Sequence, residues 1–494
     1  MAKRMQPSKP SRIKLTAGAY LNYTQHLFIL LVFLVSLVGI PTTGVKAAST
    51  IDFTGEELLG KPTDTSIAIN IIPDSEIEYH YLYGTSPGSL TLDTPNYTAA
   101  AGQPHEILIS GLSPNTQYYY RMQYHAPGDA MNNWVDRSEH SFWTQRPQGS
   151  SFTFTVTSDA HATFSTAFEN AMTNIVNEHP DFNIDLGDTF LSGDVDNQTQ
   201  ANTAYLAFRE PLRFDKIGNS VPIFLTPGNH EDEEGWNLDD TPSFSPALGS
   251  IQARKAFYPT PIDDEFYSGN VDLLDAIDES TYGDDNREDY YAWTWGDALF
   301  VVIDVYQYTM ENPYGAAAGE GPDDPDTADQ WIWTLGKDQY DWFKQTLENS
   351  DAKYKFVFSH HVTGGITRDI VGVDAGYVRG GAEAAAYFEW GGENANGSWG
   401  FDTQRPGWGG VPIHQLMVDN GVSAYFHGHD HQYVYETRDG IVYQEVPSPG
   451  MTGPGFSGIY TEGTYADYST IKILQNTGHL RITVTPSLAT VIRR

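Results

Sequence analysis

Residues 182–188 read Phe-Asn-Ile-Asp-Leu-Gly-Asp, a short apolar run that ends in a glycine and an aspartate. Four further apolar runs also end in residues that can bind a metal ion. They are FTFTVTSDAH (152–161), VPIFLTPGNHE (221–231), KYKFVFSHH (353–361) and VSAYFHGHDH (422–431). Open α/β sheets form their binding sites just beyond the carboxyl ends of their strands. We therefore expect these five strand ends to meet at one cavity.

The side chains at the strand ends belong to a narrow chemical set. They offer carboxylate, imidazole and carboxamide groups without thiolate, which suits manganese, iron or zinc. The candidates are Asp159, His161, Asp188, Asn229, His230, His360, His361, His427, His429 and His431. One tetrahedral zinc ion needs four ligands, so this set predicts two ions, about 3.5–4 Å apart, that share a carboxylate. Glycines at 187, 228 and 428 would allow backbone to approach closely.

The segments between the motifs alternate between strand and helix patterns, which is typical of an α/β domain. We predict strands at 152–157, 182–186, 221–226, 291–304, 355–358 and 422–426, and helices at 164–178, 202–217, 337–349 and 412–420. Residues 232–289 read as a polar, acidic insertion without a clear period, and residues 432–490 as mainly β.

The first part of the chain has a different pattern. Between residues 50 and 148, short runs such as TSIAINII (65–72) are separated by turn-forming residues, which is typical of a β-sandwich. The stretch GLSPNTQYYYR (111–121) resembles a tyrosine corner, in which a tyrosine hydroxyl bonds to nearby backbone. Residues 145–151 (QRPQGSS) read as a linker. We expect this β-domain to pack on the α/β domain; the alternative is that it binds a partner.

The overall composition excludes several functions. The 494 residues include 28 lysines and arginines against 64 aspartates and glutamates, a formal charge of −36. This balance argues against a nucleic-acid partner, because proteins that bind nucleic acids carry basic patches. The absence of cysteine excludes disulfides, thiolate metal sites and cysteine nucleophiles.

Residues 1–47 have the layout of a secretory signal peptide. Basic residues precede the apolar run LFILLVFLVSLVGI (27–40), and Val45, Lys46 and Ala47 fit the small-x-small rule before a cleavage site. The alternative is an uncleaved membrane anchor, but 14 apolar residues are few against the about 20 that span a bilayer. We expect a secreted protein, extracellular or periplasmic, with no membrane span once the leader is removed.

In their order along the chain, the motifs resemble those of the calcineurin-like metallophosphoesterase superfamily. Asp-x-His, Gly-Asp, Gly-Asn-His-Glu, a histidine after a strand and Gly-His-x-His follow one another between residues 152 and 431. The preceding β-domain is similar to the fibronectin type III-like N-terminal domain of purple acid phosphatases. The resemblance implies a β-domain at 50–148 and a catalytic α/β domain at 151–490, a β-sandwich flanked by helices (αββα).

The resemblance also implies a role for each motif residue. The first metal ion would bind Asp159, His161 and His431, the second Asn229, His360 and His429, and Asp188 would bridge them. His230 would protonate the leaving oxygen or act as an electrostatic partner of the phosphate, with Glu231 orienting it. His361 is the alternative to His360, because adjacent side chains on a strand point to opposite faces.

The activity that the resemblance implies is hydrolysis of small-molecule phosphate esters by hydroxide that the metal ions activate. A phosphomonoesterase is favoured, with a phosphodiesterase or nucleotidase on the same site as the alternative. A catalytically degenerate binding or adhesion protein is a third hypothesis, which the complete ligand set disfavours.

Two features near the motifs carry further expectations. Leu191 stands where purple acid phosphatases carry a tyrosine, and His161 where they carry a different residue, so we do not expect an iron–tyrosinate pair. The glycine- and tryptophan-rich residues 387–408 suggest a lid over the substrate, with Arg405 as one candidate for contact with phosphate.

Overall fold

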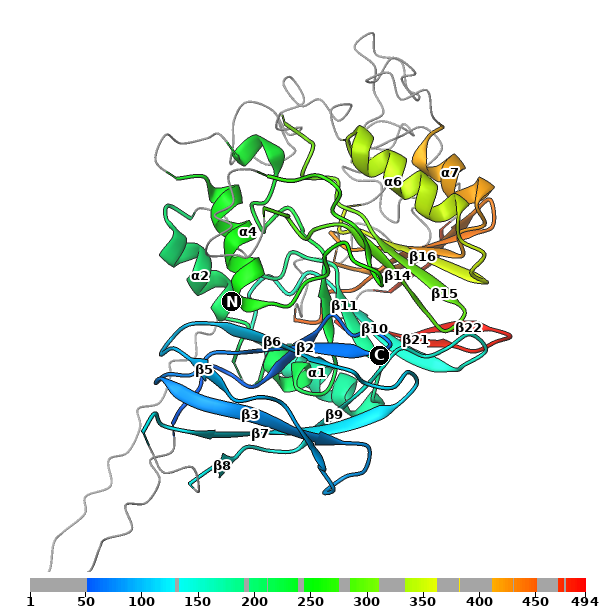
Figure 1. Ribbon diagram of the computed structural model, residues 1–494. Coiled ribbons are helices and arrows are strands. Elements are labelled where there is room, and N and C mark those ends of the chain that lie inside the picture. The colour runs from blue at the N-terminus through cyan, green and yellow to red at the C-terminus, as the bar shows by residue number, and fades with distance from the viewer. Residues whose placement is uncertain are drawn as a thin grey trace, which may run out of the picture. The chain divides into compact units, whose positions relative to one another are not determined.

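The computed structural model describes most of the chain beyond residue 50. The described ranges are 51–128, 133–190, 195–210, 212–238, 244–274, 285–310, 334–361, 382, 411–429, 431–450, 470–474 and 477–494. The predicted leader lies outside them. Residues Ala48–Arg494 form one compact unit, and the described strands form four sheets (Figure 1). In the described part of the chain, no helix combines the length and the apolar character that a bilayer crossing requires.

Two small sheets build the N-terminal part, as predicted for an all-β region. One has the order β1 (Leu58–Gly60), β2 (Ser66–Ile71), β6 (His105–Ser110). The other has the order β4 (Leu92–Asp93), β3 (Ile77–Gly84), β7 (Gln117–His125), β8 (Val135–Asp136), with β5 (Tyr97–Ala99) on β3 and β9 (His140–Trp143) on β7. Their inner faces share one apolar core of isoleucine and tyrosine side chains. The hydroxyl of Tyr118 accepts a hydrogen bond from the backbone N–H of Ser113 at 3.0 Å, the local tie that the tyrosine-corner pattern predicts.

Two larger sheets form the central β-sandwich. The five-stranded sheet has the order β12 (Ile223–Leu225), β11 (Phe182–Asp185), β10 (Phe152–Thr157), β21 (Leu480–Val484), β22 (Ala489–Arg493). The eight-stranded sheet has the order β13 (Ser268–Gly269), β14 (Tyr291–Trp295), β15 (Ala298–Val302), β16 (Tyr354–Phe358), β17 (Ala424–His427), β19 (Ile441–Glu445), β18 (Tyr433–Arg438), β20 (Thr470–Leu474). An aromatic core fills the space between them: the Phe154 ring of β10 lies 5.1 Å from Phe300 of β15.

Helices cover the outer faces of both large sheets, which confirms the αββα α/β fold. α6 (Lys337–Glu348) and α7 (Ile413–Asp419) lie together over the eight-stranded sheet (Figure 1), and their apolar faces share a core with its strands. α1 (Thr166–Glu178), α2 (Gln198–Leu206), α3 (Phe214–Gly218) and α4 (Pro246–Phe257) share a core with the strands β1 and β12. A 3-10 turn, η1 (Gly235–Asn237), precedes α4.

The structure corrects three sequence predictions. The helix predicted at 202–217 is two helices, α2 and α3. The sequence between them contains Pro211, and proline has no backbone N–H to donate to a helical hydrogen bond. The strand predicted at 291–304 is the hairpin β14–β15. The insertion 232–289 contains the regular helix α4, which begins at the Ser245 cap and buries mostly small residues and Arg254, so its sequence shows little apolar period.

Arg209 connects the β-sandwich of the N-terminal part to the helices of the central fold. Its guanidinium is fully buried and donates to the side chain of Asn70 on β2 at 2.8 Å and to the carbonyl of Phe257 at 2.7 Å. It also pairs with the Asp215 carboxylate of α3 at 3.0 Å. These contacts support the expected packing of the β-domain.

Candidate metal centre

The five strand ends meet where the parallel strands of both large sheets finish. β10, β11 and β12 run parallel in one sheet, and β16 and β17 run parallel in the other. Backbone hydrogen bonds then join the loops that follow: His161 donates to the carbonyl of Asp188 at 2.8 Å, and Gly428 donates to that of His360 at 2.9 Å. These bonds join the loops in pairs within each sheet, and the backbone N–H of His429, which donates to Asp159 Oδ1 at 3.1 Å, links the two pairs.

A first group of side chains gathers donor atoms within 4.8 Å of one another. It consists of Asp159, His161, Asp188 and His431. The Nε2 atoms of His161 and His431 lie 2.8 Å apart, and that of His431 lies 3.5 Å from Asp159 Oδ1. The distance from His161 Nε2 to Asp188 Oδ2 is 3.6 Å. Two carboxylates and two imidazoles thus point into one small volume.

A second group shares Asp188 with the first. It consists of Asp188, His360 and His429, whose donor atoms also lie within 4.8 Å of one another. His360 Nε2 is 3.2 Å from Asp188 Oδ2. The carboxamide oxygen of Asn229 lies 3.2 Å from His360 Nε2 and 2.9 Å from His429 Nδ1. Asn229 therefore adds a fourth oxygen or nitrogen donor to this group.

Burial and charge show that both groups suit a cation. Asp159 and Asp188 are 0% and 1% exposed, and buried carboxylates are costly unless they are paired or bind metal. Burial alone would raise the pKa of Asp188, but His360 and the other histidines outweigh it and hold that pKa well below its ordinary value. Burial lowers the pKa of His431 to about 4 and that of His429 well below its usual range. Both imidazoles are thus neutral at pH 7 and keep a lone pair for a metal ion.

The adjacent histidines His360 and His361 are both buried, but they face different surroundings. His360 also holds its second ring nitrogen, Nδ1, 2.9 Å from the carbonyl of Leu186, which fixes the orientation of the ring. The His361 ring lies 4.9 Å from that of His429, and the His361 carbonyl accepts a hydrogen bond from the Tyr425 hydroxyl. Burial, with the charge of His360 next, lowers the pKa of His361 to about 3.

His230 lies at the edge of the first group. It is exposed, and its ring centroid is 5.1 Å from that of His161. Its backbone N–H donates to Asp188 Oδ1 at 2.8 Å. The backbone contact fixes the position of the residue while the imidazole faces solvent.

Glu231 holds two of the motif loops together. Its Oε2 accepts the backbone N–H groups of Asp188 at 2.8 Å and Gly228 at 2.6 Å, and its Oε1 accepts those of Thr189 at 2.8 Å and Phe190 at 2.9 Å. The sequence predicts that Glu231 orients His230. The four contacts of its carboxylate described here hold the backbone that carries Asp188 and Asn229.

The motif loops have unusual backbone conformations. Asp159, His161, Asp188, His429 and His431 all have φ between 49° and 81°, a region that non-glycine residues seldom adopt. Such conformations persist where surrounding contacts impose them, and they concentrate at functional sites.

A close approach explains the glycine of the third motif. A Cβ atom at 228 would lie 2.4 Å from both the backbone nitrogen and Oδ1 of Asp188. Only glycine therefore lets the loop after β12 lie against the loop after β11.

Ser448, after β19, is a supporting residue that sequence analysis missed. Its hydroxyl donates to the carbonyl of Asp159 at 2.7 Å, and its backbone N–H donates to the carbonyl of His431 at 3.2 Å. A serine in the run Pro-Ser-Pro-Gly is not part of any metal-binding motif, so its supporting role is seen only in the folded chain. Leu191, Asp430 and the predicted lid at 387–408 with Arg405 lie outside the described residues.

Comparisons with known proteins identify the class. The profile of the calcineurin-like phosphoesterase family matches residues 152–433, more than half of the chain. The chain therefore belongs to the calcineurin-like phosphoesterase family, and it is a metal-dependent phosphoester hydrolase.

Two solved structures share the fold at low sequence identity. Purple acid phosphatase PPD1 from yellow lupin (Lupinus luteus) seeds has a TM-score of 0.56 and 16% identity, over 89% of this chain and 71% of that chain. The structure of PhoD has a TM-score of 0.57 and 15% identity, over 90% of each chain. No curated protein matches at the sequence level.

Proposed function

We propose that this chain is a secreted phosphatase that hydrolyses phosphate monoesters of small molecules with two transition-metal ions, iron, manganese or zinc. The observation that carries the proposal is the pair of donor groups that share one carboxylate, Asp188. Sharing a carboxylate is how two-metal hydrolytic sites hold their ions a few ångströms apart.

The residues divide between the two ions as follows. Asp159, His161, Asp188 and His431 would hold one ion, and Asp188, Asn229, His360 and His429 the other. Ions bound there would supply Lewis acidity, which makes water more acidic and offsets phosphate charge. The cationic centre would also let an anionic ester approach a chain whose formal charge is −36.

His230 would act on the leaving group. The imidazole is exposed beside the first donor group, and its backbone is anchored to Asp188. A side chain so placed can approach the ester oxygen of a phosphate lying on the donor groups. A proton from His230 to that oxygen would let the alcohol leave in neutral form.

A substrate comparison tests the reaction class. The purified protein, loaded separately with manganese, iron and zinc, should hydrolyse p-nitrophenyl phosphate with a higher kcat/KM than bis(p-nitrophenyl) phosphate. A reversed preference would indicate a phosphodiesterase on the same site. No hydrolysis of either ester by protein with two bound ions would support the degenerate binding protein instead.

The domain limits and the export of the chain belong to the same proposal. Residues 1–47 would be a cleaved signal peptide, 50–148 a fibronectin type III-like domain and 151–490 the catalytic domain. The signal-peptide layout and the contacts of Arg209 between the two folded parts support this division. Expression with export, followed by N-terminal sequencing, should give a mature chain that begins at Ala48. A chain that keeps residues 1–47 and stays with the membrane would instead favour the uncleaved anchor.

A further inference from the structure

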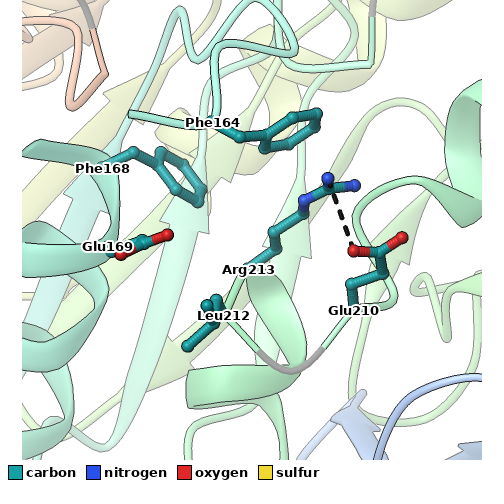
Figure 2. Close-up of a pocket in the computed structure, with 6 residues that line it drawn as sticks. All are labelled: Phe164, Phe168, Glu169, Glu210, Leu212 and Arg213. Carbon is teal, nitrogen blue, oxygen red and sulfur yellow. Dashed lines mark ion pairs between the residues drawn. The ribbon is translucent and has the colours of Figure 1, made fainter. Parts of the chain in front are cut away.

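A pocket lies beside the loop that follows β10, between the start of α1 and the segment before α3. Its volume is about 270 Å³, and it is lined by Phe164, Phe168, Glu169, Glu210, Leu212 and Arg213 (Figure 2). A cavity of about 150 Å³ is large enough to take a benzene molecule. The pocket therefore has room for one aromatic ring.

The exposed wall of the pocket is unusually apolar. Phe164 is 40% exposed and Leu212 is 53% exposed. No other phenylalanine, tyrosine or tryptophan among the described residues falls in the exposed class. An exposed aromatic ring beside a pocket offers an apolar face on which another ring can stack.

The Phe164 ring is held in place by its neighbours. The guanidinium of Arg213 lies 3.1 Å from its centroid, and the Phe208 ring lies at 5.2 Å. Arg213 is itself paired with Glu210 at 3.4 Å (Figure 2). The Phe164 ring is therefore already ordered. A ligand that stacks on it would not have to restrict the motion of this side chain, so little conformational entropy is lost on binding.

A short loop joins one wall of the pocket to the candidate metal centre. Phe164 follows His161 by three residues, so their Cα atoms are at most about 11 Å apart. The loop between them is fastened: Thr163 donates its backbone N–H to Ala160 at 2.9 Å, and the Ser165 hydroxyl donates to the carbonyl of Gly450 at 2.6 Å. Phe164 in the pocket wall and His161 in the first donor group therefore lie on one short, fixed loop.

We propose that this pocket binds the organic group of the phosphate ester, and that the group it takes is a neutral aromatic ring. Glu169 and Glu210 disfavour an anionic group, and Arg213 already pairs with Glu210. The apolar wall disfavours a sugar or a polyol, whose hydroxyl groups would lose their contacts with water. This inference rests on the proposed function and adds a substrate class to it.

The test uses two substrates that differ only in the ring, 2-phenylethyl phosphate and ethyl phosphate. Both release primary alcohols, so their chemical steps are closely matched. The wild-type protein should have the higher kcat/KM with 2-phenylethyl phosphate. In Phe164→Ala the ratio of the two kcat/KM values should fall about tenfold, the scale of one lost aromatic contact. Leu273→Ala, which removes an exposed leucine outside the pocket, should leave the ratio unchanged.

Three outcomes would overturn the subsite: no preference in the wild type, an unchanged ratio in Phe164→Ala, or an equal fall with both substrates. A second measurement keeps the subsite separate from the reaction. Calorimetric titration of the metal-loaded protein with 2-phenylethylphosphonate and ethylphosphonate should show the same preference and its loss in Phe164→Ala. If both phosphonates bind as predicted but neither ester is hydrolysed, the subsite stands and the monoesterase proposal fails. Equal affinities would refute the subsite even in an active enzyme.

Discussion

Glu231 and Asp188 lie on different motif loops, and Oε2 of Glu231 accepts the backbone N–H of Asp188 at 2.8 Å. Asp188 is the residue that both donor groups share. Because the same carboxylate also accepts N–H groups from Gly228, Thr189 and Phe190, one side chain sets the spacing between the loops after β11 and β12. The geometry of the candidate centre thus depends on a residue that is in neither group.

Glu231→Gln should weaken metal binding while the chain still folds. The amide keeps one acceptor oxygen but turns an N–H₂ group toward backbone donors, so the two loops should separate. Supporting residues of this kind typically change metal affinity by about 10–100-fold. Metal titration followed by calorimetry measures the effect. Glu348→Gln on the surface of α6 makes the same chemical change and should bind metal like the wild type, and an unaltered affinity in Glu231→Gln would contradict the role.

His230→Ala should retain both metal ions and lose activity. We expect turnover to fall by about 10²–10⁴, the usual scale for a lost general acid. The loss should be larger for alkyl phosphates than for p-nitrophenyl phosphate, whose leaving group needs little protonation. Elemental analysis and steady-state kinetics on the same preparation check both parts. Loss of metal, or an equal loss with every leaving group, would remove His230 from the acid role.

Asp188→Ala should behave differently, because it removes the carboxylate that both donor groups share. Metal content should fall, and activity should fall with all substrates in parallel. Elemental analysis of the purified variant is the direct measurement. Full occupancy by two ions in Asp188→Ala would show that the bridge has been assigned to the wrong residue.

Chelation should destabilise the protein as well as inactivate it. Without cations, the buried carboxylates of Asp159 and Asp188 lie close to each other, offset by neighbouring imidazoles and by two backbone N–H groups. A ligand at about 1,000 times its Kd adds about 4 kcal/mol to the free energy of unfolding. Thermal unfolding with and without chelator should therefore show a clear fall in Tm, reversed by added manganese, iron or zinc. Equal Tm values would argue that the groups hold no metal.

Replacing the buried Arg209 should destabilise the contact between the N-terminal β-sandwich and the helices of the central fold. Arg209→Met leaves the Asp215 carboxylate buried without its partner, which typically costs about 3–5 kcal/mol. Arg121→Met on β7 is the control, since its pair with Asp136 is partly exposed and should contribute under about 1 kcal/mol. Urea denaturation compares the two variants. A similar fall in the free energy of unfolding in both variants would mean that the buried ion pair contributes no more to stability than the exposed one.

Asp215 should also make stability depend on pH. Burial raises its pKa from 3.8 to about 6, although Arg209 partly opposes the rise. Because the folded pKa lies above the unfolded one, the stabilising contribution is complete below about pH 4 and is lost as the pH rises through about 6, a change on the order of 3 kcal/mol. Relative to Asp215→Asn, the wild type should be favoured most near pH 4, with the difference shrinking toward pH 7. Urea denaturation at several pH values would reveal a constant difference if the prediction is wrong.

Much of the fold follows from patterns that are local in sequence. The strands β10, β11 and β16 and the helices α1 and α6 lie within about two residues of the predicted limits, because apolar period and caps act over short distances. The helix α4 escaped prediction, because its buried face uses small residues and the ion pair of Arg254 with Glu233 in place of an apolar stripe. A helix stabilised by tertiary contacts of this kind leaves little trace in the sequence.

The sequence by itself determined the class of this protein and the set of candidate ligands. The five motifs follow apolar strands, and parallel strands bring their carboxyl ends to one edge, so residue type and order were enough. Only the tertiary structure decided which donors lie together, for example His161 beside His431, which are 270 residues apart in the chain. It also directed His360 toward Asp188, placed the Glu231 carboxylate between two loops and left Phe164 exposed. Those relations depend on how loops that are far apart in the sequence pack against each other, and a local sequence pattern does not encode such packing.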